Sequence, residues 1–181
     1  MTEHADATAE APVLRVRDLH IDFDLATGPV HAVRGIDLEV RRGEVLAVVG
    51  ESGSGKSATA LAVLGLNPRP PVRYPSGTIE FEGRELLGLP EAELRRIRGA
   101  GISIVFQDPM SCLNPVVRVG DQVEEVRRLH RGGRRGTHRA AALEALAAAG
   151  IPDPARRYTQ YPHQLSGGLR QRGMIAMALA G

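Results

Sequence analysis

One glycine-rich stretch of the chain carries residue types at the spacing needed to hold phosphate groups. It fits the pattern G-x-x-x-x-G-K-[ST], and its residues are Gly50, Glu51, Ser52, Gly53, Ser54, Gly55, Lys56 and Ser57. Glycines let consecutive backbone N–H groups point inward around phosphates, and the lysine ammonium reaches the β- and γ-phosphates. The serine hydroxyl at the end of the pattern can bind Mg²⁺. The stretch therefore predicts a phosphate-binding loop for a nucleoside triphosphate.

The segments on either side of this loop predict the elements that must position it. Before it, Glu44 to Val49 is short and rich in valine, which predicts a buried parallel strand. After it, Ala58 to Leu66 favours a helix that ends at Asn67-Pro68. The N-terminus of that helix would add partial positive charge beside the phosphates. Because both flanks fit, a chance match by a glycine-rich turn is the less favoured interpretation.

Two later motifs hold polar residues that could act in the same chemistry. Gln164 to Arg172 contains Leu-Ser-Gly-Gly, in which Ser166 is a good N-cap for an apolar helix over Leu169 to Ala180. Gly101 to Phe106 predicts a strand that ends at Gln107. Taken alone, a Ser-Gly-Gly run is more often a loop, and a glutamine after a strand is more often a surface residue.

In the order loop, glutamine, Leu-Ser-Gly-Gly, the three motifs resemble those of ATP-binding cassette (ABC) ATPases. The resemblance implies an ATPase with ATP and Mg²⁺ as cofactors. It implies that Lys56 and Gln107 take part in catalysis, and that Ser57 and Gln107 lie beside the metal. Leu169 stands where the family commonly has glutamine, a departure that some subfamilies tolerate.

The same resemblance implies that the chain works as one of a pair. In ABC proteins, the helix that follows Leu-Ser-Gly-Gly begins opposite the phosphates held by the loop of a second ATP-binding subunit. A capped helix N-terminus with exposed amides favours anions. The residues expected to act on the partner's nucleotide are Ser166, Gly167 and Gly168.

Longer versions of two motifs resemble a narrower group, the ATPases of dipeptide, oligopeptide and nickel importers. They run from Phe106 to Pro115 and from Tyr161 to Gly168. Cys112 stands where serine is usual in that group, and Gly173 where a larger apolar residue is common. The resemblance implies integral membrane permeases as partners, and a solute-binding protein as an indirect one. It places the chain at the cytoplasmic face of the cell membrane.

Two residues near the N-terminus are candidates for contact with the base. Phe23 stands where ABC ATPases place an aromatic residue that stacks on adenine, and ordinary packing beneath the sheet is its alternative role. His31 is a weaker candidate. His163, just before Leu-Ser-Gly-Gly, is expected to be structural.

The elements together predict an α/β fold. In ABC terms they form a P-loop NTPase core with an N-terminal antiparallel β-subdomain and an inserted α-helical subdomain, incomplete at the C-terminus. We expect residues 1–12 to be a disordered tail and residues 13–181 to be a partial ABC domain, with the helical subdomain at about 108–161. Leu14 to Phe23 alternates like an exposed antiparallel strand, Val30 to Val40 is similar, and Thr78 to Glu82 predicts a further short strand. The further helices expected are Glu91 to Arg98, Gln122 to Leu129 and Arg139 to Ala149.

Composition fits a soluble domain and argues against several other classes. The 181 residues are 43% hydrophobic and 24% charged, and no run approaches the roughly 18 apolar residues that a membrane span needs. The polar start lacks the apolar core of a secretory signal, and one cysteine excludes an internal disulfide. The net charge of +2 is too small to indicate nucleic acid. The basic stretch from Arg127 to Arg139 contains no aromatic residue for stacking, so we expect a solvated loop.

The sequence leaves two alternatives open. In ABC ATPases, the helix after Leu-Ser-Gly-Gly leads to a strand ending in Asp-Glu and then to a switch histidine. The chain ends at Gly181 before such residues, so it is expected to be incomplete and could be a nucleotide-binding fragment without turnover. Alternatively, Ile102 to Asp108 could be the metal-binding strand of a different P-loop NTPase, with Asp108 as ligand. Leu-Ser-Gly-Gly argues against the second alternative.

Overall fold

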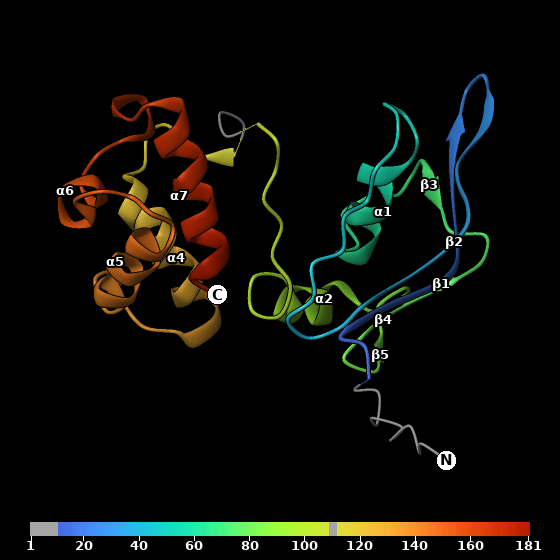
Figure 1. Cartoon of the computed structure of the whole chain (residues 1–181), viewed down its shortest axis with the longest axis horizontal. Coiled ribbons are helices and arrows are strands. Elements are labelled where there is room, and N and C mark those ends of the chain that lie inside the picture. Colours follow the sequence, from blue (N-terminus) through green and yellow to red (C-terminus); the bar gives the residue numbers. More distant parts are fainter. Residues whose placement is uncertain (1–10, 109–111) are drawn as a thin grey trace, which may run out of the picture. The chain divides into compact units, whose positions relative to one another are not determined.

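The computed structural model describes residues 11–108 and 112–181, which form two compact units within Met1–Leu94 and Arg95–Gly181. Figure 1 shows the strands of the first unit and the helices of the second. Most of the tail expected at residues 1–12 lies outside the described residues, as do Pro109, Met110 and Ser111 of the glutamine motif.

The first unit is built on an antiparallel sheet. Strands β1 (Leu14–Leu25) and β2 (Gly28–Val40) form a long hairpin, and the other edge of β1 pairs with β4 (Thr78–Phe81) and with the short β3 (Val72–Arg73). Strand β5 (Arg84–Glu85) pairs with β4. The buried face of the sheet carries side chains with no exposed surface, namely Val16, Leu19, Ile21 and Ile79. The three predicted strands are confirmed, but β1, expected to be exposed, pairs on both edges and buries Val16, Leu19 and Ile21.

Two helices belong wholly or partly to this unit. Helix α1 (Lys56–Val63) contacts β2 and buries Ala62 and Val63. It begins two residues before the predicted helix and ends three residues before that helix does. Helix α2 (Glu91–Ile97) begins in the first unit and ends in the second, with acidic residues in its first turn and arginines in its last, as the helix dipole favours.

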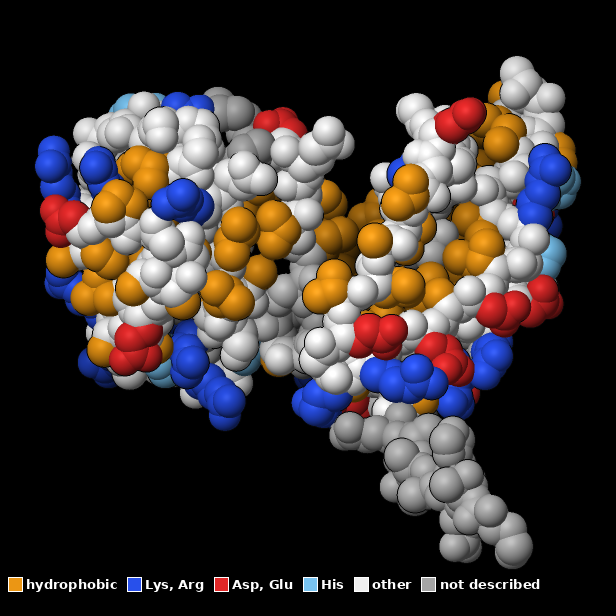
Figure 2. All heavy atoms as spheres, in the orientation of Figure 1, with side chains coloured by type: hydrophobic (Ala, Val, Ile, Leu, Met, Phe, Trp, Pro, Cys, Tyr) orange, Lys and Arg blue, Asp and Glu red, His pale blue; other side chains and the backbone are white. Residues whose placement is uncertain are grey.

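The strands expected at Glu44 to Val49 and Gly101 to Phe106 are absent from the described structure. Both segments are irregular apart from one isolated bridge between Arg98 and Ile102, and the side chains of Val45 and Val49 are 93% and 92% exposed. A parallel strand needs a neighbour for its N–H and C=O groups, and no strand of the described residues pairs with Glu44 to Val49. The prediction of a buried strand there is therefore wrong. Figure 2 shows hydrophobic side chains at the surface of the first unit.

The second unit is a cluster of helices around one apolar core. Its main helices are α4 (Val119–Arg131), α5 (Arg139–Ala148) and α7 (Gly167–Leu179), which contact one another. Between α5 and α7 lie the short helix α6 (Pro154–Tyr158) and a 3₁₀ turn, Pro162–Gln164. The predicted helices are confirmed, with α4 starting three residues earlier than expected. The core side chains of the second unit include Val119, Val123, Ala142, Leu146, Ile151 and Ala176.

Helices α4 to α6 fall within the range expected for the inserted helical subdomain, whose boundaries stay a prediction. Within the described ranges, no helix combines the length and apolar character that crossing a membrane requires.

Candidate functional site

The glycine-rich loop folds around the ammonium group of Lys56. Its Nζ donates to the carbonyl oxygens of Gly50 at 2.7 Å and Glu51 at 2.6 Å, and to the Oγ of Ser54 at 3.2 Å. These three contacts match the three donors of an ammonium group. The loop therefore holds the cationic side chain of Lys56 against its own oxygen atoms.

Gly55 fixes the place where the loop becomes helix. It has φ of 88°, and a Cβ on it would lie 2.5 Å from the carbonyl oxygen of Ala32 and 2.9 Å from a methyl group of Val33. No L side chain fits such a contact, so the loop packs against β2 through the bare glycine backbone. Gly53 also has positive φ, at 83°, but has open space around it.

The start of α1 is suited to an anion. Gly55 is its N-cap and supplies no side-chain cap, and the first turn contains no acidic residue. The partial positive charge of the helix N-terminus is therefore not offset by a side chain of that turn. Ser57, the second residue of the helix, is exposed to solvent. Exposure leaves its hydroxyl accessible to a metal ion or a phosphate oxygen.

The second glycine-rich motif forms the start of α7. Ser166 has an extended backbone and is the N-cap, and its Oγ accepts from the backbone N–H of Leu169 at 3.4 Å. This confirms the predicted cap. Gly167 and Gly168 are exposed, and a Cβ on either would meet no atom within 4 Å. The first turn contains no acidic residue, so this helix start is also suited to an anion.

The candidates for base contact lie in the first unit. Phe23 on β1 is partly buried and pairs through its backbone with Val30 and Val72. The Nδ1 of His31 lies 2.8 Å from a carboxylate oxygen of Asp22. Since the carbonyl oxygen of Ala32 lies against Gly55, the hairpin that carries these residues runs past the end of the loop.

The remaining candidates lie in the second unit. Gln107 is exposed in an irregular segment, as is Asp108, whose carbonyl oxygen accepts from the thiol of Cys112. The described residues contain no group of three His, Cys, Asp or Glu side chains able to hold a metal. The ring of His163 stacks on Tyr161 with 5.7 Å between centroids, which fits its expected structural role.

Sequence reasoning missed a buried glutamate in the second unit. Glu124 on α4 is only 2% exposed, and its carboxylate accepts from the hydroxyl of Tyr158 at 2.7 Å and from the N–H groups of Gly136 and His138 at 2.5 and 3.1 Å. Burial would raise the pKa of Glu124, but these hydrogen bonds outweigh it and the pKa is lowered. Burial, followed by the bond to Glu124, raises the pKa of Tyr158. A glutamate beside Glu125 in a charged helix gives no sequence signal for this role.

Both helix starts lie within a region of the chain that matches one family of known proteins. The model of the family described as ABC transporter matches residues 33–181. The chain belongs to the ABC transporter family. The resemblance inferred from the three motifs is confirmed, and so is the α/β fold class.

Individual relatives of this ABC chain are peptide-transport proteins by name. It is 47% identical over 168 residues to the oligopeptide transport ATP-binding protein OppD of Bacillus subtilis, covering 93% of this chain and 47% of the relative. It is 46% identical over 168 residues to the dipeptide transport ATP-binding protein DppD of Escherichia coli, covering 93% of this chain and 51% of the relative. The chain therefore spans about half the length of these relatives.

Solved structures of ABC cassettes share its fold. One is a dimeric post-hydrolysis state of the cassette MJ0796 bound to ADP and Pi, with a TM-score of 0.80, 29% identity, and coverage of 92% of this chain and 69% of that one. Another is cbiO1 from Clostridium perfringens, part of the transporter complex cbiONQ, with a TM-score of 0.72, 28% identity, and coverage of 94% and 62%.

Proposed function

We propose that the protein is the ATP-binding subunit of an ABC importer, and that it couples ATP binding and hydrolysis to the uptake of peptides. The observation that carries the proposal is the loop closed around the Lys56 ammonium and packed through Gly55 against β2. OppD and DppD, named above as oligopeptide and dipeptide transport proteins, favour peptides as cargo over nickel.

Mg-ATP is the proposed ligand of the first unit. The loop amides and Lys56 hold its β- and γ-phosphates, and Phe23 stacks on the adenine. A Mg²⁺ ion bound to a nucleotide takes most of its ligands from phosphates and water, so one or two protein oxygens suffice. The exposed hydroxyl of Ser57 fits this requirement. On the family resemblance alone, the amide of Gln107 is the proposed second ligand and would also orient water.

The start of α7 completes the proposed site in a second copy or a paralogue. Ser166, Gly167 and Gly168 present a capped, exposed helix N-terminus to the phosphates held by the partner's loop. MJ0796, which shares the fold, is described as dimeric and bound to ADP and Pi. In this proposal, integral membrane permeases dock on the pair at the cytoplasmic face of the membrane, and a solute-binding protein delivers the peptide.

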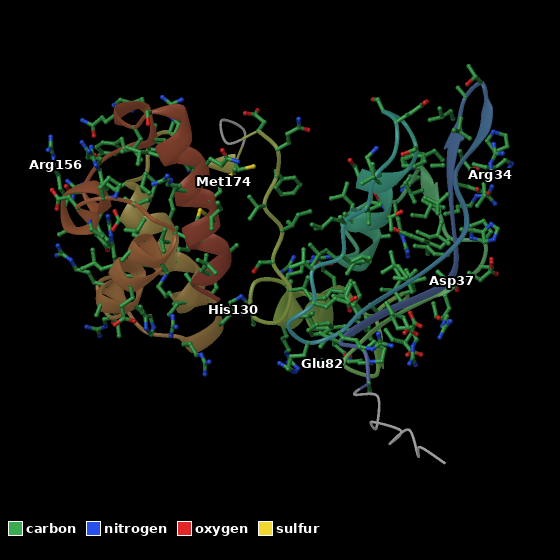
Figure 3. The ribbon with its side chains drawn as sticks, viewed as in Figure 1. Arg34, Asp37, Glu82, His130, Arg156 and Met174 are labelled. Atoms are coloured by element: carbon green, nitrogen blue, oxygen red, sulfur yellow. The ribbon has the colours of Figure 1, made fainter. Side chains whose placement is uncertain are left out.

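Calorimetric titration with Mg-ATP tests the nucleotide proposal. Lys56→Ala removes charge-assisted hydrogen bonds to phosphate, so the affinity should fall about 10- to 100-fold. Arg34→Ala is the matched control, because Arg34 is an exposed cation of the same unit that lies on the side of β2 away from α1 (Figure 3). Equal affinities for wild type and Lys56→Ala would overturn the proposal. Phosphate release measured on the same samples separates hydrolysis from binding alone.

A further inference from the structure

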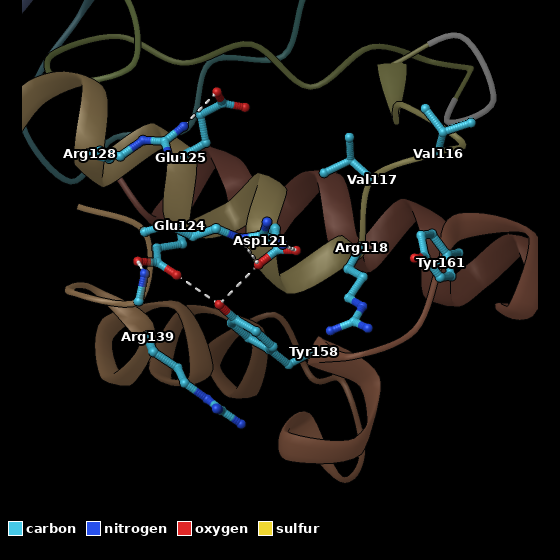
Figure 4. A pocket seen from close by; sticks show the side chains of 12 residues that line it. Val116, Val117, Arg118, Asp121, Glu124, Glu125, Arg128, Arg139, Tyr158 and Tyr161 are labelled. Carbon is cyan, nitrogen blue, oxygen red and sulfur yellow. Dashed lines mark hydrogen bonds and ion pairs between the residues drawn. The ribbon is translucent and has the colours of Figure 1, made fainter. Parts of the chain in front are cut away.

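The second unit contains a pocket of about 840 Å³ that includes none of the proposed nucleotide-binding residues (Figure 4). Its wall comes from the segment before α4, from α4 itself, and from residues at the start of α5 and the end of α6. We call it the tyrosine–arginine pocket, and its principal residues are Val116, Arg118, Glu124, Arg139, Tyr158 and Tyr161.

Each of the carboxylates in the wall already has partners. Asp121 is paired with Arg135, and Glu125 with Arg128 at 3.0 Å. Glu124 accepts three hydrogen bonds, from one hydroxyl and two backbone amides. These groups are therefore satisfied without a ligand, and they leave the other two arginines of the wall without a counter-charge.

Arg118 and Arg139 form no ion pair within the described part of the chain, and each lies over a tyrosine ring instead. The Cζ of Arg139 is 5.0 Å from the centroid of the Tyr158 ring, and that of Arg118 is 6.0 Å from the centroid of Tyr161. A cation–π contact uses the face of the guanidinium and leaves its in-plane N–H donors available. Both arginines are exposed, so their donors can reach a ligand from solvent.

The size and charge of the pocket define the class of ligand. Small-molecule pockets usually measure about 300–1,000 Å³. With four arginines against three carboxylates in the wall, the net charge is +1, which suits one carboxylate better than a phosphate dianion. Val116, 78% exposed, and the partly exposed ring of Tyr161 offer apolar surface. The whole unit carries fourteen arginines against six acidic residues, a field that attracts anions.

We propose that the tyrosine–arginine pocket binds a small organic carboxylate. Arg118 and Arg139 hold the carboxylate through their forked donors, and Val116 and the ring of Tyr161 cover its apolar body. This site shares no residue with the proposed nucleotide site, so either proposal can fail without the other.

The probe is benzoate, titrated into the full chain and followed by ¹H–¹⁵N NMR chemical shifts. We expect saturable shifts that benzamide, its uncharged isostere, does not produce. Arg118→Gln and Arg139→Gln should each weaken benzoate binding about tenfold or more, through loss of charge-assisted hydrogen bonds. Both side chains are exposed and neither makes a side-chain cap, so the fold should persist, as the spectrum itself will show.

Arg156→Gln is the matched control, since Arg156 is an exposed arginine on α6 that points outward and does not line the pocket (Figure 3). It should bind benzoate as the wild type does. The proposal is overturned if benzoate causes no saturable shift, if benzamide binds equally well, or if both pocket variants retain wild-type affinity. Tighter binding of inorganic phosphate than of benzoate would overturn the assigned ligand class.

Discussion

The helices α1 and α7 both begin at a glycine-rich motif, yet the surroundings of the two helix starts differ. Gly55 has positive φ and is pressed against the backbone of β2, so its own unit requires a glycine there. Gly167 and Gly168 lie in helical backbone with open space around them, so the second unit does not require them to be glycines. Within the second unit, larger residues would therefore fit at these two positions.

The two helix starts also differ in charge. The loop before α1 holds a lysine ammonium among its own carbonyl oxygens, while α7 offers a serine cap and backbone amides. The first arrangement combines a cation with a helix N-terminus, which favours a polyphosphate. The second adds a weaker, neutral set of donors. This difference fits a division in which α1 binds the nucleotide of its own chain and α7 contacts that of a partner.

The largest effect is expected at Gly55. Gly55→Ala forces a Cβ into the carbonyl oxygen of Ala32 and places alanine at positive φ, which should destabilise the first unit by about 3 kcal/mol and abolish Mg-ATP binding. Urea unfolding and ATP titration measure the two effects. Gly83→Ala is the control, because Gly83 has φ of 77° but open space, so only the backbone cost of about 1 kcal/mol should remain. Equal losses of stability for both variants would show that the close contact between Gly55 and Ala32 does not contribute.

An intermediate effect is expected in the second unit at Tyr158. Tyr158→Phe leaves the buried carboxylate of Glu124 without one of its three donors, which should lower the free energy of unfolding by about 2 kcal/mol. The affinity of the first unit for Mg-ATP should not change. Unchanged stability in urea would show that the hydroxyl is not needed to satisfy Glu124.

The effect of Tyr158→Phe should also depend on pH. The pKa of Glu124 is lowered from its ordinary value of 4.5, so its ionised form contributes stability that is present above that value and is lost as the pH falls through the folded-state pKa. The hydroxyl of Tyr158 helps to cause this shift. The difference in stability between wild type and Tyr158→Phe should therefore be smaller below pH 4.5 than it is near neutral pH. A difference that stays constant would contradict this assignment.

The smallest effect on stability is expected at α7. Gly168→Ala meets no neighbouring atom and replaces a poor helix former, so the stability should stay the same or rise by up to about 1 kcal/mol. Binding of Mg-ATP to the first unit should also persist, while ATP-dependent association of two copies should weaken. If the variant loses stability instead, the contrast with Gly55 fails.

The sequence predicted those parts of the fold that depend on local pattern. Alternation located β1 and β2, and the apolar run behind Ser166 located both α7 and its cap. The phosphate-binding loop was predictable because its chemistry needs particular residue types at a fixed spacing. Its internal contacts could not be predicted, since the position of Gly55 beside Ala32 depends on the packing of α1 against β2.

Features that depend on partners far away in the chain could not be predicted from the sequence. The valine-rich segment from Glu44 to Val49 has the local character of a buried strand, but strand structure requires a hydrogen-bonding neighbour. Glu124 looks like a solvated residue of a charged helix until α6 and the segment before α5 enclose it. The roles of Phe23 and Gln107 stay predictions, because each rests on the family resemblance and on a nucleotide.

Complementation between two inactive variants tests the division between α1 and α7 most directly. Lys56→Ala disables the loop, and Ser166→Arg blocks the start of α7. In a head-to-tail pair of one copy of each, one of the two composite sites keeps an intact loop and an intact helix start. We expect fluorescently labelled copies to associate in Mg-ATP when the two variants are mixed, and neither variant to associate alone. Association of either variant alone at the wild-type level, or no association in the mixture when the wild type does associate, would contradict the account.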